Sequence, residues 1–248
     1  MRKAIFLSLI ITLVVFNACK KSTEDFQTAA LSDYYPLKIG KYITYNLDSS
    51  VVYKNFGASV VVISYQVKYV VDALITDNLG RPAYRIIRYI RKTAADPWVA
   101  DNTSMAIPTL NAIEFVENNF RYLKMKLPVK EGYTWKGNTY IDTYSLNSTV
   151  KYLDDWDYTY DSLNARVKIG TVFIDSTLKV AQRNEIIGNP SNPNSYSERN
   201  IGEEKYARGI GLVYRKFLHT EYQPPVPGHP GAFADASYGV TLTMIDHN

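Results

Sequence analysis

The most regular pattern in the chain is an alternation of apolar and polar residues between Val60 and Asp72. Large apolar or aromatic side chains occupy every second position there, namely Val61, Ile63, Tyr65, Val67, Tyr69 and Val71. A period of two places these side chains on one face of a β-strand. The turn sequence Asp77-Asn78-Leu79-Gly80 and the run 83–91 follow, so this region is predicted to form a long hairpin with one buried face.

Shorter runs of the same kind continue along the chain. Strands are expected within 41–47, 112–127, 140–152, 165–183, 203–222 and 238–245. The segment 93–110, with Pro97 and Pro108, is predicted to be irregular, and the region 93–118 has room for one short helix. The 21 tyrosines suit a pleated surface. The predicted fold class is therefore all-β or nearly so: a curved antiparallel sheet, a sandwich or a partly open barrel, with at most one or two short helices.

The N-terminus has the pattern of a bacterial lipoprotein signal. Arg2 and Lys3 precede an apolar stretch, 4–16, that is too short to cross a bilayer but suits a signal peptide. Small Ala18 stands directly before Cys19, the one cysteine of the chain. We therefore predict a signal peptide at 1–18, a lipidated flexible tether at 19–33, and a single β-rich domain at 34–248.

Lipidation of Cys19 carries several further expectations. Its acyl chains make the membrane a partner and place the protein in the cell envelope, with the outer membrane as the expected location. Because Cys19 is the sole cysteine, none is left for a disulfide, a thiolate metal site or a nucleophile. Removal of Arg2 and Lys3 leaves 26 basic and 24 acidic residues, a net charge of +2, which argues against a nucleic-acid partner.

Two segments share the pattern Pro-apolar-Lys-x-Gly-x-x-apolar. The first runs from Pro36 to Ile43 and the second from Pro128 to Trp135. Proline and glycine at these positions predict a turn that leads into a strand. The similarity indicates either two related β units within one domain or two independent strand entries of the same kind.

Three segments together resemble a loose group of Bacteroidota lipoproteins that has no agreed activity. They are YYPLKIGKYITYNL at 34–47, LPVKEGYTWKG at 127–137 and EEKYARGIGLVYRKF at 203–217. The chain departs from the group at Ile43, where tryptophan is usual. The resemblance implies an envelope location and a β-rich fold, and it implies no chemistry.

One acidic and aromatic run is the candidate ligand site. It comprises Asp154, Asp155, Trp156, Asp157, Tyr158 and Tyr160. Carboxylates and aromatic rings in this density could contact a sugar or a calcium ion, or form a solvated turn with the rings packed at its edge. Beside it, Asp161-Ser162-Leu163 and Asp175-Ser176-Thr177 are similar to O-glycosylation acceptor sites.

No sequence motif indicates catalysis. His219, His229 and His247 lack metal-site spacing, no Gly-x-Ser-x-Gly occurs, and Gly209-Ile210-Gly211 lacks the third glycine of a phosphate cradle. No cofactor and no metal are expected.

The predicted function is a non-catalytic, membrane-anchored binding or structural module for a glycan, a lipid or an envelope protein. One alternative is an open-barrel carrier of an apolar molecule, with a cavity of several hundred Å³. The other is a glycan-active enzyme with two carboxylates about 5–10 Å apart.

Overall fold

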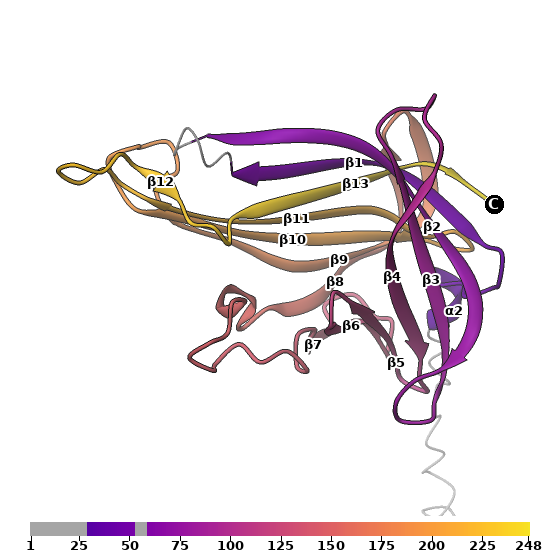
Figure 1. Ribbon diagram of the computed structural model, residues 1–248. Coiled ribbons are helices and arrows are strands. Elements are labelled where there is room, and N and C mark those ends of the chain that lie inside the picture. Colours follow the sequence, from indigo (N-terminus) through magenta and orange to yellow (C-terminus); the bar gives the residue numbers. More distant parts are fainter. Residues whose placement is uncertain (1–28, 53–58) are drawn as a thin grey trace, which may run out of the picture.

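The computed structural model describes residues 29–52 and 59–248, which form one antiparallel sheet curved nearly into a barrel (Figure 1). The only helices among these residues are α2 (Leu31–Tyr34) and the 3₁₀ turn η2 (Lys151–Leu153). The predicted fold class is thus confirmed. The predicted signal peptide and Cys19 lie outside the described residues. Within the described part of the chain, no helix has the length and apolar character needed to cross a membrane.

Thirteen strands make up the sheet. They are β1 (Tyr42–Val52), β2 (Val60–Thr76), β3 (Pro82–Arg91), β4 (Val99–Pro108), β5 (Ala112–Glu117), β6 (Phe120–Lys126), β7 (Thr134–Lys136), β8 (Asp157–Ile169), β9 (Val172–Gly188), β10 (Ser197–Ala207), β11 (Gly211–Gln223), β12 (Ala232–Phe233) and β13 (Tyr238–His247).

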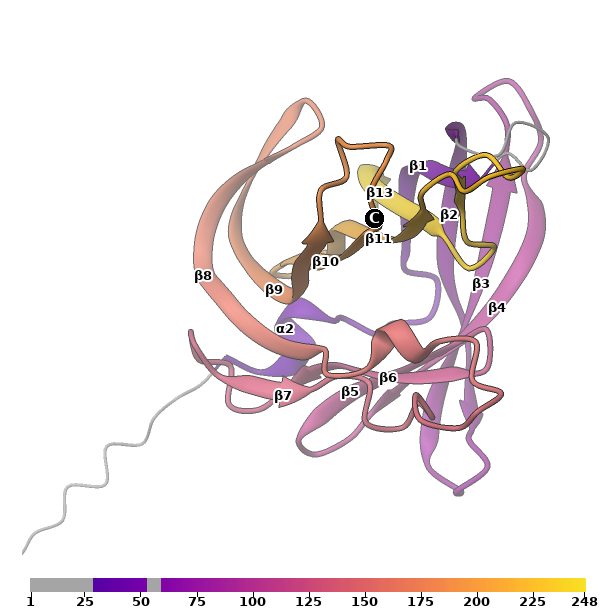
Figure 2. The same ribbon diagram turned by 90° about the vertical axis from the view of Figure 1, so that its left-hand side faces the viewer.

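The strand order divides the sheet into two six-stranded meanders. The order is β6-β5-β4-β3-β2-β1-β13-β11-β10-β9-β8-β7, and β12 pairs with β11 off this path. The first meander is β1 to β6, and the second is β7 to β11 followed by β13. Strand β1 pairs with β13, so the first strand of one meander joins the last strand of the other. Viewed from one end, the strands form a ring with β5, β6 and β7 along its lower side (Figure 2).

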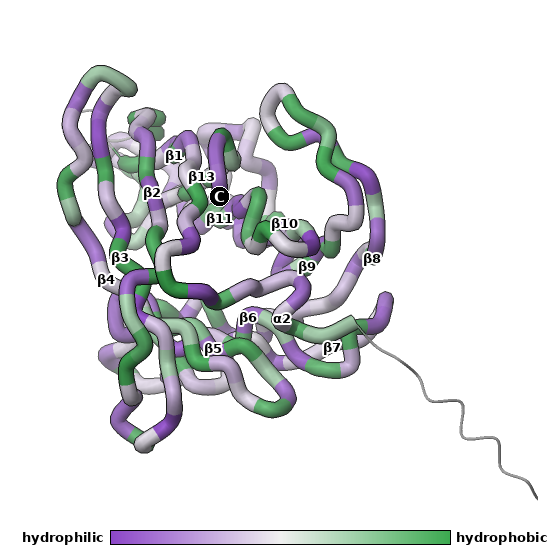
Figure 3. Tube along the Cα trace, turned by 90° about the vertical axis from the view of Figure 1, so that its right-hand side faces the viewer, coloured by the Kyte–Doolittle hydropathy of each residue, from purple (hydrophilic) through white to green (hydrophobic). Residues whose placement is uncertain are grey.

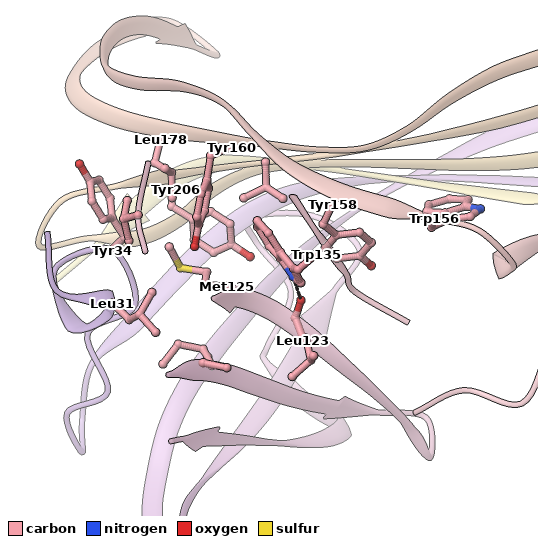
Figure 4. Packing of buried hydrophobic residues seen from close by; sticks show 14 of the residues in the cluster. Leu31, Tyr34, Leu123, Met125, Trp135, Trp156, Tyr158, Tyr160, Leu178 and Tyr206 are labelled. Atoms are coloured by element: carbon pink, nitrogen blue, oxygen red, sulfur yellow. Dashed lines mark hydrogen bonds between the residues drawn. The ribbon is translucent and has the colours of Figure 1, made fainter. Parts of the chain in front are cut away.

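Four hydrogen bonds bring the ends of the sheet, β6 and β7, together. The Leu123 amide donates to the Gly137 carbonyl at 2.8 Å, and the Trp135 indole donates to the Leu123 carbonyl at 2.8 Å (Figure 4). The Tyr160 hydroxyl accepts from the Lys126 amide at 2.9 Å and donates to the Lys126 carbonyl at 2.8 Å. The side chains of Trp135 and Tyr160 therefore bond to the backbone of β6 at the end of the sheet, where β7 is only three residues long.

Both meanders begin with the same turn. Gly40 and Gly132 have φ angles of +85° and +78°, and each donates its amide to a carbonyl of the following long strand at 2.8 Å. The register also matches, because Ile43 is paired with Tyr69 and Trp135 with Tyr158. The two Pro-to-Gly segments are therefore structurally equivalent entries into β1 and β7.

The core lies between the inward faces of the curved sheet. Its largest cluster joins α2 to strands of both meanders, with Trp135, Tyr160 and Tyr206 packed together (Figure 4). Apolar and polar residues alternate along the strands (Figure 3). The predicted hairpin is confirmed as β2 and β3, but its buried face is shorter than expected. Val67 and Val71 are buried, whereas Val61 is 39% exposed because the start of β2 extends beyond the core.

Three boundary expectations are corrected. Residues 99–108, expected to be irregular, form β4, which carries fully buried Ala106 and Ile107. Residues 140–152, expected to be a strand, form turns that lead into η2. The end of the expected tether belongs to the packed domain, since Leu31 is buried in the core cluster. Helix α2 was not predicted because a helix of four residues is too short to show a helical period in the sequence.

Candidate functional site

A cavity inside the barrel is the candidate site. One wall is the segment from Tyr35 to Ile43, which links α2 to β1, and the other walls come from strands of both meanders. Its free volume is about 90 Å³. A larger empty space of about 700 Å³ around it includes open solvent at the mouth, so the smaller figure sets the size of a ligand that fits. The apolar part of the lining includes Leu37, Val71, Ile86, Phe115, Ile210 and Leu242.

The cavity follows from one difference between the two meanders. At the position that Trp135 occupies in the second meander, the first has Ile43, which lines the cavity. Trp135 is 4% exposed and its ring packs edge-on against Tyr158 at 5.9 Å. The smaller Ile43 stands beside Tyr69 in the equivalent register and leaves unfilled space there. Core packing tolerates few voids, so the smaller side chain at this position is one reason why space remains between the two meanders.

Four charged side chains converge on one end of this cavity. Glu117 ends β5, Lys124 lies on β6, Glu204 on β10 and Arg215 on β11. The ammonium of Lys124 lies 2.6 Å from Glu204 Oε1, and the Arg215 guanidinium lies 3.1 Å from Glu117 Oε2. Arg215 Nε also lies 3.6 Å from Glu204 Oε1, which connects the two pairs. The exposed fractions of these side chains range from 1% to 17%.

Local structure turns these charges inward. A register shift between Ile113 and Glu114 gives β6 an extra residue, and this bulge directs Lys124 inside. Glu204 and Arg215 are directly opposite each other in the β10–β11 ladder and so share a face. Tyrosine hydroxyls complete the arrangement: Tyr206 donates to Glu204 Oε2 at 2.6 Å, and Tyr45 donates to the Leu212 carbonyl at 2.7 Å.

The neighbouring charges determine how these groups ionise. Burial alone would raise the pKa of Glu204, but the charges of Lys124 and Arg215 outweigh it and lower that pKa. Burial lowers the pKa of Lys124, an effect that Glu204 only partly offsets. For Arg215, burial is outweighed by Glu117 and Glu204, so its pKa is raised. Two acidic and two basic groups therefore give the site a net charge near zero.

The run predicted from sequence divides between the core and the surface. Trp156, Tyr158 and Tyr160 are at most 2% exposed, and their polar atoms bond inside the protein. The carboxylates point outward: Asp155 and Asp157 are 72% and 51% exposed and pair with Lys136, and Asp154 accepts from Thr143. A sugar could stack on these rings only if the core unpacked. The arrangement is that of a solvated turn with aromatic side chains packed beneath it.

Other residues singled out by sequence also have internal roles. Within residues 29–52 and 59–248, no group of three or more His, Cys, Asp or Glu side chains could hold a metal ion. His219, on β11, is 2% exposed. Its ring stacks on Tyr152 at 3.7 Å, its Nδ1 lies 2.8 Å from Asn200 Oδ1, and burial lowers its pKa. Ser162 and Ser176 lie half-buried on β8 and β9.

The interior charges were not predicted from the sequence. Lys124 and Glu204 are 80 residues apart and meet only when β6 and β10 face each other across the barrel. A weak signal exists in the alternation of 203–206, which places Glu204 with Tyr206 on one face. That pattern does not say which face is inside.

Comparisons of the chain with protein-family models, with curated proteins and with solved structures gave no match. The functional argument therefore rests on the geometry of the barrel interior.

Proposed function

We propose that this protein is a lipid-anchored, non-catalytic binding module of a bacterial cell envelope, and that its ligand occupies the cavity inside the barrel. The observation that carries the proposal is the convergence of Glu117, Lys124, Glu204 and Arg215 on a mostly apolar cavity. Lys41 is the one further charged residue of the lining. An apolar pocket with a few convergent polar groups is the usual form of a small-molecule site. Buried charges are costly to a fold, which supports a role for them beyond stability.

The size of the cavity favours a small ligand over a long-chain lipid. A carrier of a large apolar molecule would need several hundred Å³. The free volume of about 90 Å³ is smaller than the roughly 150 Å³ cavity that admits benzene in an engineered protein core. The proposal therefore concerns molecules of no more than about six non-hydrogen atoms.

The cavity is tested by filling it. We would screen neutral and singly charged molecules of this size against the purified chain by ligand-observed NMR, and we expect binders that are lost in Ile43→Trp. This substitution places in the first meander the side chain that the second has at Trp135. Leu146→Trp, at a position 92% exposed, is the matched control and should keep the binders. The absence of any binder, or binding that persists in Ile43→Trp, would contradict the proposal.

The anchor is tested at the sole cysteine. With Cys19→Ala, we expect the protein to leave the membrane fraction while its circular dichroism stays that of a folded sheet protein. Mass spectrometry of the native chain should show a diacylglyceryl group on an N-terminal Cys19. A chain that keeps residues 1–18, or a variant that still sediments with membranes, would overturn this part of the proposal.

A further inference from the structure

We infer that the cavity binds small monocarboxylates, with the carboxylate on Arg215 and the apolar part beside Ile43 and its neighbours. This inference rests on the proposed function, because it assumes that the cavity holds a ligand, and it names the chemical class of that ligand.

The polar end of the cavity has more hydrogen-bond donors than acceptors. Glu204 already accepts from Lys124 on one oxygen and from Tyr206 on the other. In the described part of the chain, Arg215 donates one hydrogen bond, from Nη1 to Glu117 at 3.1 Å, although a guanidinium carries five N–H groups. Lys124 donates one of its three, to Glu204. A ligand group that fits here must therefore accept hydrogen bonds.

Arg215 is the cation best placed to receive that group. Its side chain is 17% exposed, against 6% for Lys124, and it lines the cavity. Because Arg215 makes a single hydrogen bond to Glu117, most of its N–H groups remain available. Two N–H groups of a planar guanidinium can donate parallel hydrogen bonds to the two oxygens of a carboxylate. An amine would instead have to compete with Arg215 and Lys124 for the two carboxylates.

The rest of the lining fits a short apolar chain. Most residues beyond the charged end are aliphatic or aromatic, among them Leu37, Val71 and Leu242. Lys41 also lines the cavity, and its ammonium donates to the Asn248 carbonyl at 2.7 Å. A free volume of about 90 Å³ suits an acid of about four carbons.

Glu117 opposes the binding of an anion. The four charges sum to zero, so a carboxylate adds one uncompensated negative charge to a buried site. Glu117 also holds the guanidinium group that the ligand needs. Its replacement by glutamine leaves the site with one net positive charge and weakens the competition for Arg215. The structure thus leads to an unusual expectation, which is that loss of a site residue raises affinity.

The ligand class is tested with three matched probes on the full chain. We would titrate butanoate, butan-1-ol and butylamine at pH 7 and follow the chemical shifts of the cavity residues. Butanoate should bind at least tenfold more tightly than butan-1-ol, and butylamine should not bind. If butan-1-ol binds as tightly as butanoate, or the amine binds more tightly, this inference is overturned while the cavity proposal stands. If none of the three binds, both are overturned.

Variants of the charged residues test the roles of Glu117 and Arg215 in butanoate binding. Glu117→Gln should tighten butanoate binding at least threefold, and Arg215→Gln should weaken it at least tenfold. Lys216→Gln removes the same charge from the next residue of β11, on the opposite face, and should leave the affinity within twofold. If Arg215→Gln does not fold, Glu117→Gln decides the question, since damage to the fold would not raise affinity. An unchanged or weaker affinity in a folded Glu117→Gln protein contradicts the inference.

Discussion

At the scale of single residues, Glu204 is the carboxylate around which the interior charges are arranged. Its side chain is 1% exposed, Lys124 lies on one oxygen and Tyr206 on the other. A buried pair of this kind contributes little net stability compared with an apolar pair, because both ions lose their hydration. The loss of one partner is different, since it leaves the other charge buried without compensation.

We predict that Lys124→Met and Glu204→Gln each lower the free energy of unfolding by about 3–5 kcal/mol. The double variant should lose clearly less than the sum, because it removes both charges and leaves Arg215 paired with Glu117. Urea unfolding of the two single variants and the double variant measures this coupling. Additive losses would show that the two groups are energetically independent.

At the scale of structural elements, the two entry turns allow a direct comparison. Gly40 and Gly132 both have positive φ, and neither has a heavy atom within 4 Å of where a Cβ would stand. The cost of a side chain there comes from the left-handed backbone alone. Gly40→Ala and Gly132→Ala should therefore each destabilise the protein by about 1–2 kcal/mol, and by similar amounts.

Asparagine provides the control for this prediction, because its short polar side chain tolerates the left-handed region better than alanine does. In thermal unfolding, Gly40→Asn and Gly132→Asn should each lose less stability than the alanine variant at the same site. An alanine variant as stable as the natural protein would show that the turn can adopt another backbone conformation.

The Tyr160 hydroxyl makes two of the hydrogen bonds that close the barrel. Tyr160→Phe keeps the packing of the ring but removes both bonds to the Lys126 backbone. A buried N–H or C=O left without a partner costs about 1–3 kcal/mol. We expect a loss of stability of this order and faster hydrogen exchange at the Lys126 amide. Exchange that speeds up equally in β1 and β13 would mean that the effect is global rather than confined to the β6–β7 junction.

Sequence predicted the elements whose alternation is unbroken and missed those in which it is interrupted. The hairpin of 60–91 and the strands within 112–127 and 203–222 were predicted because inward and outward residues alternate there. Strand β4 was missed because it lies between Pro97 and Pro108 and buries Ser104 with Ala106. The cavity could not be predicted, because its walls come from strands that meet only through long-range pairing.

At the scale of the whole molecule, two similar meanders form one barrel with different interiors. Equivalent turns lead into β1 and β7, and β1 and β7 lie beside the last strands of the opposite meanders. The second meander fills its entry with Trp135, which also bonds across the junction to Leu123. The first has Ile43 at this place and keeps a cavity. The same framework thus supplies a rigid closed side and a side with room for a ligand.

The whole molecule should also lose stability in acid, because several buried carboxylates are ionised by their partners. Burial would raise the pKa of Glu204, Glu114 and Asp77, yet in each case neighbouring cations and hydrogen bonds lower it. For Glu114 these partners are Arg81 and Arg121, and for Asp77 they are Arg81 and the amide of Leu79.

A carboxylate with a lowered pKa in the folded state binds fewer protons there than in the unfolded chain. Its stabilising effect is therefore complete above its ordinary pKa, 4.5 for Glu, and is lost as the pH falls toward the folded value. We predict that the free energy of unfolding, measured with urea, decreases steadily from about pH 5 to pH 3.

The double variant Lys124→Met/Glu204→Gln should show a shallower decrease, because one of the three carboxylates no longer titrates. A decrease as steep as that of the natural protein would assign the acid sensitivity to Glu114 and Asp77, and a flat profile in the natural protein would contradict the ionised state of all three.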